Sequence, residues 1–285
     1  MSDSVLITGA SVGFGQEMAL YLAERGFRVY ASLRDLGRRA ALESEAARRN
    51  VNVRILRLDV TDRASIVEAV QTVVAESGGI YGVVNNAGTF LRGYFEDLEE
   101  HEIREVFDAN LFGAMAVTRA VLPHMRAARR GRIVVITSVA GRIAAPAGSA
   151  YCASRFAQEG FAESLSQEVE PHGVQVILVE PGMTWHEHWT LERGVAARAK
   201  DPQGPYTAWF VRAQQLFDQA MRSSPITVAD VAQTVHRALT ARHPRLRYVV
   251  GRRASLVIAL RRYTPDEIFE RLYFGEVMRR VTGSR

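Results

Sequence analysis

The chain alternates short apolar runs with longer segments in which apolar and polar positions follow the period of a helix. The apolar runs are rich in β-branched residues and predict seven strands, at residues 5–8, 27–33, 53–60, 80–85, 132–138, 174–180 and 247–251. The helical segments lie between them, at about residues 14–25, 36–49, 63–77, 99–129 and 150–170. This alternation predicts an α/β fold, a doubly wound parallel sheet of about seven strands with helices on both faces.

The pattern becomes irregular after residue 182. Residues 183–241 contain helical stretches interrupted by three prolines, and we expect them to form a loop and helices that cap a substrate site. Residues 252–285 predict a basic helical extension whose second helix begins at Pro265. Because no repeat, linker or low-complexity segment divides the sequence, residues 1–285 are predicted to form a single domain.

Composition places the chain among soluble globular proteins. Hydrophobic residues make up 47% and charged residues 24%, which is enough apolar material for one large core. The first ten residues show no signal peptide, and no apolar stretch is long enough to span a membrane. A single cysteine excludes an internal disulfide, so we expect a cytoplasmic protein.

Charge is distributed unevenly. The formal net charge is +5, and residues 242–285 hold eleven arginines against four acidic residues. We interpret this end as a solvated amphipathic segment; contact with a membrane surface is the less favoured alternative, and no nucleic-acid motif is present. Lys200 is the only lysine of the chain, so arginine supplies nearly all of its positive charge.

The first predicted strand runs into the glycine-rich sequence TGASVGFG, and a predicted helix follows. Gly9 permits a tight turn, Gly13 lets backbone N–H groups approach a pyrophosphate, and Gly15 lets the helix pack closely on the strand. Strand, turn and helix in this order predict a dinucleotide site in a Rossmann-type fold.

The second predicted strand ends at Arg34, nineteen residues after Gly15. An acidic residue there would bind the adenosine ribose and repel a 2′-phosphate, whereas an arginine can bind that phosphate with two hydrogen bonds. This position therefore predicts NADP(H) as the cofactor, although the neighbouring Asp35 favours the opposite preference.

Further short motifs follow in order: LDV at 58–60, NNAG at 85–88, DANLFGA around Asn110, ITSVAG around Ser138, YCAS from Tyr151, and PG at 181–182. With the glycine turn, this ordered set resembles the short-chain dehydrogenase/reductase family over roughly residues 4–184. The stretch RVYASLRDL also resembles NADP-preferring members that reduce steroids and other lipophilic carbonyls.

The resemblance implies roles for individual residues. The implied cofactor-binding residues are Gly9, Ser11, Gly13, Phe14, Gly15, Arg34, Asp59, Val60, Asn86, Ala87, Gly88, Tyr151, Arg155, Pro181, Gly182 and Thr184. The implied catalytic group is Asn110, Ser138, Tyr151 and Arg155. The family also implies a homo-oligomer, with the helix that carries Tyr151 at an interface.

The family places a lysine where this chain has Arg155. In carbonyl reduction, Tyr151 would give a proton to the developing alkoxide, Ser138 would hydrogen-bond the substrate oxygen, and Asn110 would anchor a water. A tyrosine hydroxyl normally titrates near pH 10, so a neighbouring cation is needed for work near neutrality. Arginine keeps the charge and the donors of lysine but cannot release a proton into a relay.

Three interpretations of Arg155 remain. It is a conservative replacement in an NADP(H)-dependent reductase; it belongs to a Ser-Tyr-Arg site like that of the related halohydrin dehalogenases, which use no nicotinamide; or the chain is a nucleotide-binding regulator without turnover. The intact TGASVGFG and NNAG motifs favour the reductase.

Apolar side chains after the motifs predict the substrate class. Phe90, Leu91, Met183, Trp185 and Trp189 are candidates to line an apolar pocket, which suggests a small hydrophobic ketone or aldehyde as substrate.

Two other features suggest chemistry but lack the necessary partners. His186 and His188 have no third ligand at a convincing spacing, so no metal is expected. Cys152 has no paired base in its sequence context, so it is not interpreted as a nucleophile.

Overall fold

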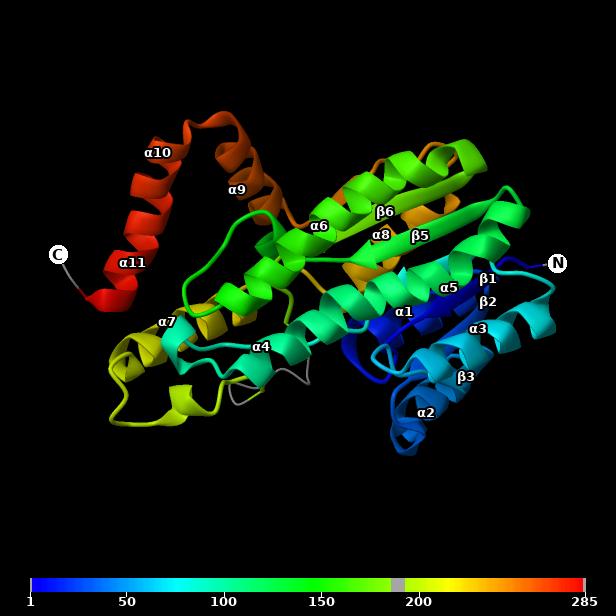
Figure 1. The fold of residues 1–285 in the computed structure, drawn as a ribbon, viewed down its shortest axis with the longest axis horizontal. Coiled ribbons are helices and arrows are strands. Elements are labelled where there is room, and N and C mark those ends of the chain that lie inside the picture. Colours follow the sequence, from blue (N-terminus) through cyan, green and yellow to red (C-terminus); the bar gives the residue numbers. More distant parts are fainter. Residues whose placement is uncertain (1, 186–192, 284–285) are drawn as a thin grey trace.

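The computed structural model describes residues 2–185 and 193–283, and its centre is a sheet of seven parallel strands in the order β3-β2-β1-β4-β5-β6-β7 (Figure 1). The strands are β1 (Ser4–Ile7), β2 (Arg28–Leu33), β3 (Val53–Arg57), β4 (Gly82–Asn85), β5 (Gly131–Ile136), β6 (Val174–Pro181) and β7 (Arg247–Val250). The predicted fold class is confirmed. The chain continues from β1 toward one edge of the sheet and from β4 toward the other edge. A crevice therefore forms at the carboxyl ends of these two strands, where ligands bind in such sheets.

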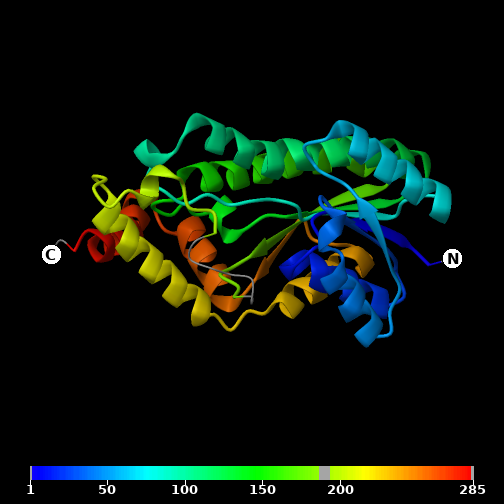
Figure 2. The same cartoon turned by 90° about the horizontal axis from the view of Figure 1, so that it is seen from below.

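Helices cover both faces of the sheet (Figure 2). One face packs against α1 (Gly13–Glu24), α2 (Ala40–Arg48) and α8 (Val228–Thr240), through residues such as Met18, Leu42 and Val235. The other packs against α3 (Arg63–Ser77), α5 (Gly113–Ala127) and α6 (Ser149–Val169), through residues such as Val70, Val121 and Leu165. The inner strands lie between two apolar layers, which explains their continuous apolar sequences.

The third strand is shorter than its sequence suggests. It ends at Arg57, where its pairing with Leu33 of β2 ends, although the apolar run continues to Val60. Because β3 is an edge strand, no second neighbour extends the pairing. Asp59 and Val60 therefore lie in the loop at the carboxyl end of the sheet.

The long segment predicted at 99–129 is helical but not uniform. It consists of α4 (Glu100–Phe107), a π-helical turn (Asp108–Phe112) and α5. The N–H of Gly113 reaches the carbonyl of Asp108, five residues back. Such turns often occur at functional sites, and this one contains Asn110.

The remaining helices gather beyond the carboxyl ends of β5 and β6 (Figure 1). They are α7 (Thr207–Arg222), α9 (Arg252–Tyr263), α10 (Asp266–Phe269) and α11 (Gly275–Thr282), with a second π-helical turn (Glu270–Phe274) before α11. Arg212 of α7 donates to the carbonyl of Thr282 at 2.7 Å, which ties α7 to the end of α11. Short 3₁₀ turns complete the described chain, at Leu36–Arg38, Phe95–Asp97, Val139–Gly141, Glu170–His172 and Arg198–Lys200.

Candidate active site

A cavity of about 2220 Å³ opens at the carboxyl ends of the strands. It extends from the glycine-rich turn, past α6, to the apolar faces of α7 and the C-terminal helices. Every residue that the sequence predicts to bind cofactor lines this cavity, as do Ser138, Phe90, Leu91 and Met183. Asn110 and Trp185 do not line it.

The glycine-rich turn has a backbone that requires its glycines. Gly9 and Gly13 have φ angles of +69° and +63°, which side chains other than glycine rarely tolerate. A Cβ at Gly15 would lie 2.3 Å from the carbonyl oxygen of Gly9, so any side chain there would force α1 away from the turn. The N-cap of α1, Val12, provides no side-chain hydrogen bond, which leaves the first N–H groups of the helix for an anionic ligand.

Asn86 has a structural task in this turn. Its side-chain amide donates to the carbonyls of Thr8 and Gly9 at 2.9 and 3.0 Å. The hydroxyl of Thr8 in turn accepts from the backbone N–H groups of Asn86 and Ala87, both at 3.0 Å. The NNAG motif therefore braces the glycine turn and presents its backbone, more than its asparagine side chain, to the cavity.

Two arginines line the cavity near the end of β2. Arg34 and Arg38 are both exposed, and neither forms an ion pair with another described residue. The carboxylate of Asp35 accepts from the N–H of Gly37 at 2.8 Å and so caps the short turn that holds Arg38. The sequence interpretation missed Arg38, whose only signal is its position four residues after Arg34.

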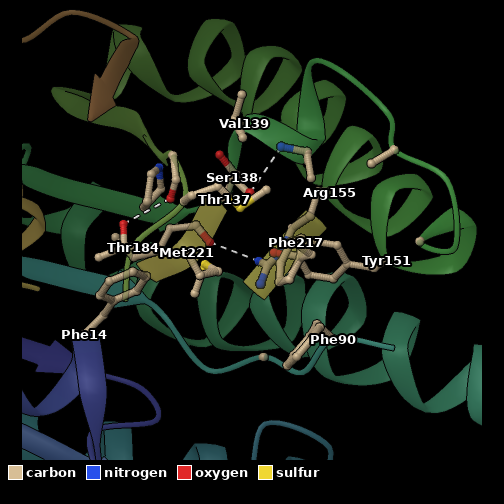
Figure 3. Close-up of a pocket in the computed structure, with 18 of the residues that line it drawn as sticks. Phe14, Phe90, Thr137, Ser138, Val139, Tyr151, Arg155, Thr184, Phe217 and Met221 are labelled. Carbon is tan, nitrogen blue, oxygen red and sulfur yellow. Dashed lines mark hydrogen bonds between the residues drawn. The ribbon is translucent and has the colours of Figure 1, made fainter. Parts of the chain in front are cut away.

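Ser138, Tyr151 and Arg155 gather on one side of the pocket, with Phe90 and Phe217 nearby (Figure 3). Ser138 follows β5, and its hydroxyl accepts from the N–H of Ala140 at 3.1 Å, which leaves its proton for another acceptor. Tyr151 and Arg155 share one face of α6, and the guanidinium carbon lies 5.1 Å from the centre of the tyrosine ring. The ring of Phe90 meets Tyr151 edge-on, with centroids 6.1 Å apart.

Arg155 is largely buried and is held from two sides. Its Nη1 donates to the carbonyl of Ile136 at 3.0 Å and to the side-chain oxygen of Gln158 at 2.7 Å, whereas its buried Nε has no hydrogen-bond partner. Nη2 makes no hydrogen bond to a described residue, and a Cβ at Gly88 would lie 3.2 Å from it. The guanidinium therefore directs Nη2 toward the NNAG motif, where a cofactor ribose is expected.

Asn110 lies behind the wall of the cavity. It is fully buried; its amide nitrogen donates to the carbonyl of Thr89 and the hydroxyl of Ser154, both at 2.9 Å, and its amide oxygen accepts from the N–H of Thr89 at 2.8 Å. These bonds fix the loop that follows the NNAG motif against α6. A catalytic contribution of Asn110 stays a prediction, and its side chain is engaged with the protein.

The substrate end of the cavity is apolar. Phe90, Leu91 and Met183 line it as predicted. Helix α7 adds Phe210, Leu216, Phe217 and Met221, and the C-terminal helices add Val257, Phe274 and Val277. No sequence motif singles out Val257, Phe274 or Val277 as residues that line the pocket.

Trp185 is not among the described residues that line the cavity. Its side chain is 44% exposed and lies outside the cavity wall, whereas the preceding Thr184 is buried, lines the cavity and donates to the carbonyl of Gly182. Thr184 thus takes the inward position of this pair. Trp189, His186 and His188 lie outside the described residues.

A cluster of buried charges lies beneath the site. The carboxylate of Glu180, fully buried, faces Arg142 at 3.1 Å and Arg247 at 3.4 Å, and Arg247 also binds Glu159 at 3.0 Å. Burial and the nearby Glu159 raise the pKa of Glu180 to about 7, against the opposite effect of the two arginines. The cluster anchors the end of β6, which carries Pro181 and Gly182.

Cys152, next to Tyr151, is buried, and burial raises the pKa of its thiol. This environment is that of a structural cysteine. Within residues 2–185 and 193–283, no group of three His, Cys, Asp or Glu side chains could hold a metal ion. None of the helices in the same ranges is long and apolar enough to cross a membrane.

A braced glycine turn, joined in one cavity to a serine, a tyrosine and a cation, defines a nucleotide-binding α/β oxidoreductase. Comparison with known sequences gives the same result, since a model of the short chain dehydrogenase family matches residues 3–192. The chain belongs to the short-chain dehydrogenase/reductase family. It is therefore an oxidoreductase of CH–OH or C=O groups in small molecules, with a nicotinamide cofactor.

Individual relatives match over nearly the whole chain. A 3-ketodihydrosphingosine reductase of Bacteroides thetaiotaomicron is 31% identical over 93% of this chain and 94% of its own length. Retinol dehydrogenase 5 of Homo sapiens is 34% identical over 93% of this chain and 86% of its own length. A short-chain dehydrogenase from Streptomyces avermitilis, of known structure, is 29% identical, superposes with a TM-score of 0.80, and covers 100% of both chains.

Proposed function

We propose that this protein uses NADPH to reduce the carbonyl group of a hydrophobic ketone or aldehyde, or catalyses the reverse oxidation. The observation that carries the proposal is the continuous cavity, which joins the glycine turn, the Ser138–Tyr151–Arg155 group and an extended apolar wall. The names of the relatives support it, because a ketodihydrosphingosine and a retinol are hydrophobic molecules with an oxygen at the reacting carbon.

The residues around the turn fit a dinucleotide. The N–H groups of α1 and the braced backbone at Gly9 would hold the pyrophosphate, and Gly88 leaves room for a ribose beside Nη2 of Arg155. Arg34 and Arg38 would bind the 2′-phosphate of NADPH, because both cations line the cavity without a carboxylate partner among the described residues. When bound, the cofactor supplies or accepts a hydride.

The protein's own residues manage the proton and the substrate oxygen. The hydroxyl of Ser138 donates a hydrogen bond to the carbonyl oxygen and orients it. Tyr151 donates the proton that the oxygen needs when the carbonyl becomes an alcohol. Arg155 places a positive charge beside this tyrosine, with the guanidinium carbon 5.1 Å from the ring centre. Phe90 and α7 exclude water from the apolar end.

The halohydrin dehalogenase alternative is less compatible with this geometry, since the glycine turn retains its positive φ angles and its open helix N-terminus. The regulator alternative differs from the reductase in turnover alone. Measurement of both cofactor binding and turnover therefore distinguishes the three.

We propose a test on the purified protein and its Tyr151→Phe variant. NADPH binding is followed by fluorescence titration, and turnover by NADPH absorbance with a panel of aliphatic, aromatic and steroid ketones and long-chain aldehydes. Loss of the phenolic proton should lower kcat by about 100-fold or more. The variant should still bind NADPH, because the open N-terminus of α1 and the Nη2 of Arg155, which would hold the dinucleotide, are unchanged.

Tyr263→Phe is the matched control, because this tyrosine is 79% exposed on α9 and should leave turnover unchanged. NADPH binding without reduction of any carbonyl would favour the regulator. Turnover that survives Tyr151→Phe would overturn the proposed role of this tyrosine.

We also propose a homo-oligomer. Phe112 and Phe156 are 56% and 45% exposed, on the π-helical turn before α5 and on α6, and a second copy packed there would cover them. The molecular mass in solution, measured by light scattering, tests this proposal.

A further inference from the structure

Gln158 is a buried polar residue to which the chemistry described so far assigns no role. It lies on α6, three residues after Arg155, and is 1% exposed. Its side-chain oxygen accepts from Nη1 of Arg155 at 2.7 Å, and its side-chain nitrogen donates to the backbone carbonyl of Asn110 at 2.6 Å. A buried amide with partners at both ends is an ordered part of its site.

The orientation of this amide follows from its partners. A guanidinium can only donate hydrogen bonds and a backbone carbonyl can only accept them. Only one orientation of the Gln158 amide satisfies both Arg155 and Asn110. The amide therefore connects a cation on α6 to the backbone of the π-helical turn before α5, without a water between them.

This connection fixes the plane of the guanidinium. Nη1 is held by Gln158 on one side and by the carbonyl of Ile136 at the end of β5 on the other. Because the guanidinium is planar and rigid, two contacts to Nη1 also determine where Nη2 points. Nη2 is then directed at the space beside Gly88, and the charge remains next to Tyr151.

We propose that Gln158 is a positioning residue that holds the Arg155 guanidinium in the orientation needed by Tyr151 and by the cofactor ribose. Arginine and glutamine form one matched pair in this site. A lysine at 155 would have a single terminal nitrogen without a fixed plane, which can reach several acceptors by rotation and depends less on Gln158. Arg155 is then an adapted part of the site, and this interpretation rests on the proposed function.

The test is a double-mutant cycle with Gln158→Met, Arg155→Lys and the double variant. Methionine preserves the length and the approximate volume of the side chain but removes both hydrogen bonds. In the Arg155 protein, Gln158→Met should lower kcat by about 10- to 100-fold, the usual effect of losing a hydrogen bond to a charged group. The KM for the carbonyl substrate should change by less than about threefold, because Gln158 does not line the cavity.

In the Arg155→Lys background the same substitution should lower kcat by less than about threefold. Equal factors in the two backgrounds would refute the pairing of Arg155 with Gln158. Unchanged kcat in the single variant Gln158→Met would refute the positioning role.

A second readout does not depend on turnover. The dissociation constant for NADPH, from fluorescence titration, should rise about fivefold or more in Gln158→Met, because Nη2 loses its direction. The unfolding free energy of each variant, from urea titration, identifies a purely structural effect: lower stability with unchanged kcat and unchanged NADPH affinity would overturn the proposal.

Gln167→Met is the matched control. Gln167 lies on the exposed face of the same helix and donates to the carbonyl of Glu163 at 3.2 Å, so its loss should change neither kcat nor NADPH affinity. If the parent protein binds NADPH but reduces no carbonyl, the proposed function fails, and the NADPH-binding cycle still decides whether Gln158 positions Arg155.

Discussion

Arg155 keeps a positive charge beside Tyr151 and holds it in a fixed plane. Its Nη1 is engaged by the protein, and its Nη2 faces the position expected for the cofactor. A residue used in this way binds and orients, and it need not release a proton. Under the proposed function, Tyr151 would regain its proton from solvent, and not by way of residue 155.

The proposed preference for NADPH can be tested at a single residue. Arg34→Ser should raise the KM for NADPH by about 10- to 100-fold and leave the KM for NADH within about threefold, because only NADPH carries the phosphate that the guanidinium binds. Steady-state kinetics with both cofactors measures the change. Arg39→Ser is the control, since Arg39 pairs with Glu43 and does not line the cavity. Equal effects on the two cofactors would contradict the assignment.

The sequence predicts those site residues that belong to short local motifs. Gly9 and Ser138 are recognisable because each comes at the end of a predicted strand, and Gly15 because it closes the glycine-rich sequence that opens the following helix. Gln158 was not predictable, because its partner Asn110 is 48 residues away and the contact depends on a π-helical turn that no periodicity reveals. The burial of Thr184 beside an exposed Trp185 was not predictable, because composition cannot tell which of two successive side chains faces inward.

At the scale of elements, glycines on two helices have different tasks. Gly15, in the first turn of α1, lies so close to the carbonyl of Gly9 that a methyl group has no room. Gly160, in the middle of α6, has no described atom outside the adjoining part of its own helix within 4 Å of the position of a Cβ. One glycine is required by packing and the other is not.

These two glycines give a matched pair of variants. Gly160→Ala should stabilise the protein by about 0.5–1 kcal/mol, because alanine favours the helix and meets no neighbour. Gly15→Ala should lower stability and weaken NADPH binding by about tenfold or more, because α1 must shift from the phosphate turn. Urea unfolding and fluorescence titration measure both. A stabilised Gly15→Ala variant with normal affinity would disprove the close packing inferred at the turn.

Apolar periodicity predicts the order of the strands and helices. It does not predict where a strand ends early or where a helix changes its winding. The strands and most helices lie where the pattern predicts them. The end of β3 at Arg57 depends on pairing with β2, and the π-helical turn within 99–129 contacts α6 through the hydrogen bond from Gln158 to Asn110. Both are tertiary effects, which a local pattern does not contain.

For the whole molecule, the buried Glu180 predicts a pH dependence of stability. Its pKa is about 7 in the folded protein and near 4.5 ordinarily, so the unfolded chain loses this proton first as the pH rises. The stability present at low pH is therefore lost between about pH 4.5 and pH 7. Glutamine does not titrate, so Glu180→Gln should remove this loss. The unfolding free energy of the variant relative to that of the parent should therefore be higher at pH 8 than at pH 5.

Urea unfolding of both proteins at pH 5 and pH 8 tests this sign. Glu163→Gln is the comparison, because it removes an exposed carboxylate that pairs with the same Arg247. It should follow the parent across this range. Parallel pH profiles for the parent and Glu180→Gln would show that the buried carboxyl does not control the transition.

Because the chain is synthesised from its N-terminus, the two halves of the site are made at different times. Strands β1 to β4, which build the glycine turn and its NNAG brace, are complete when residue 88 has been translated. Ser138 after β5, Tyr151 on α6 and Pro181 at the end of β6 follow later, by about 2.5–20 s at ordinary elongation rates. The emerging chain therefore contains the cofactor half of its site before the half that carries out the chemistry exists.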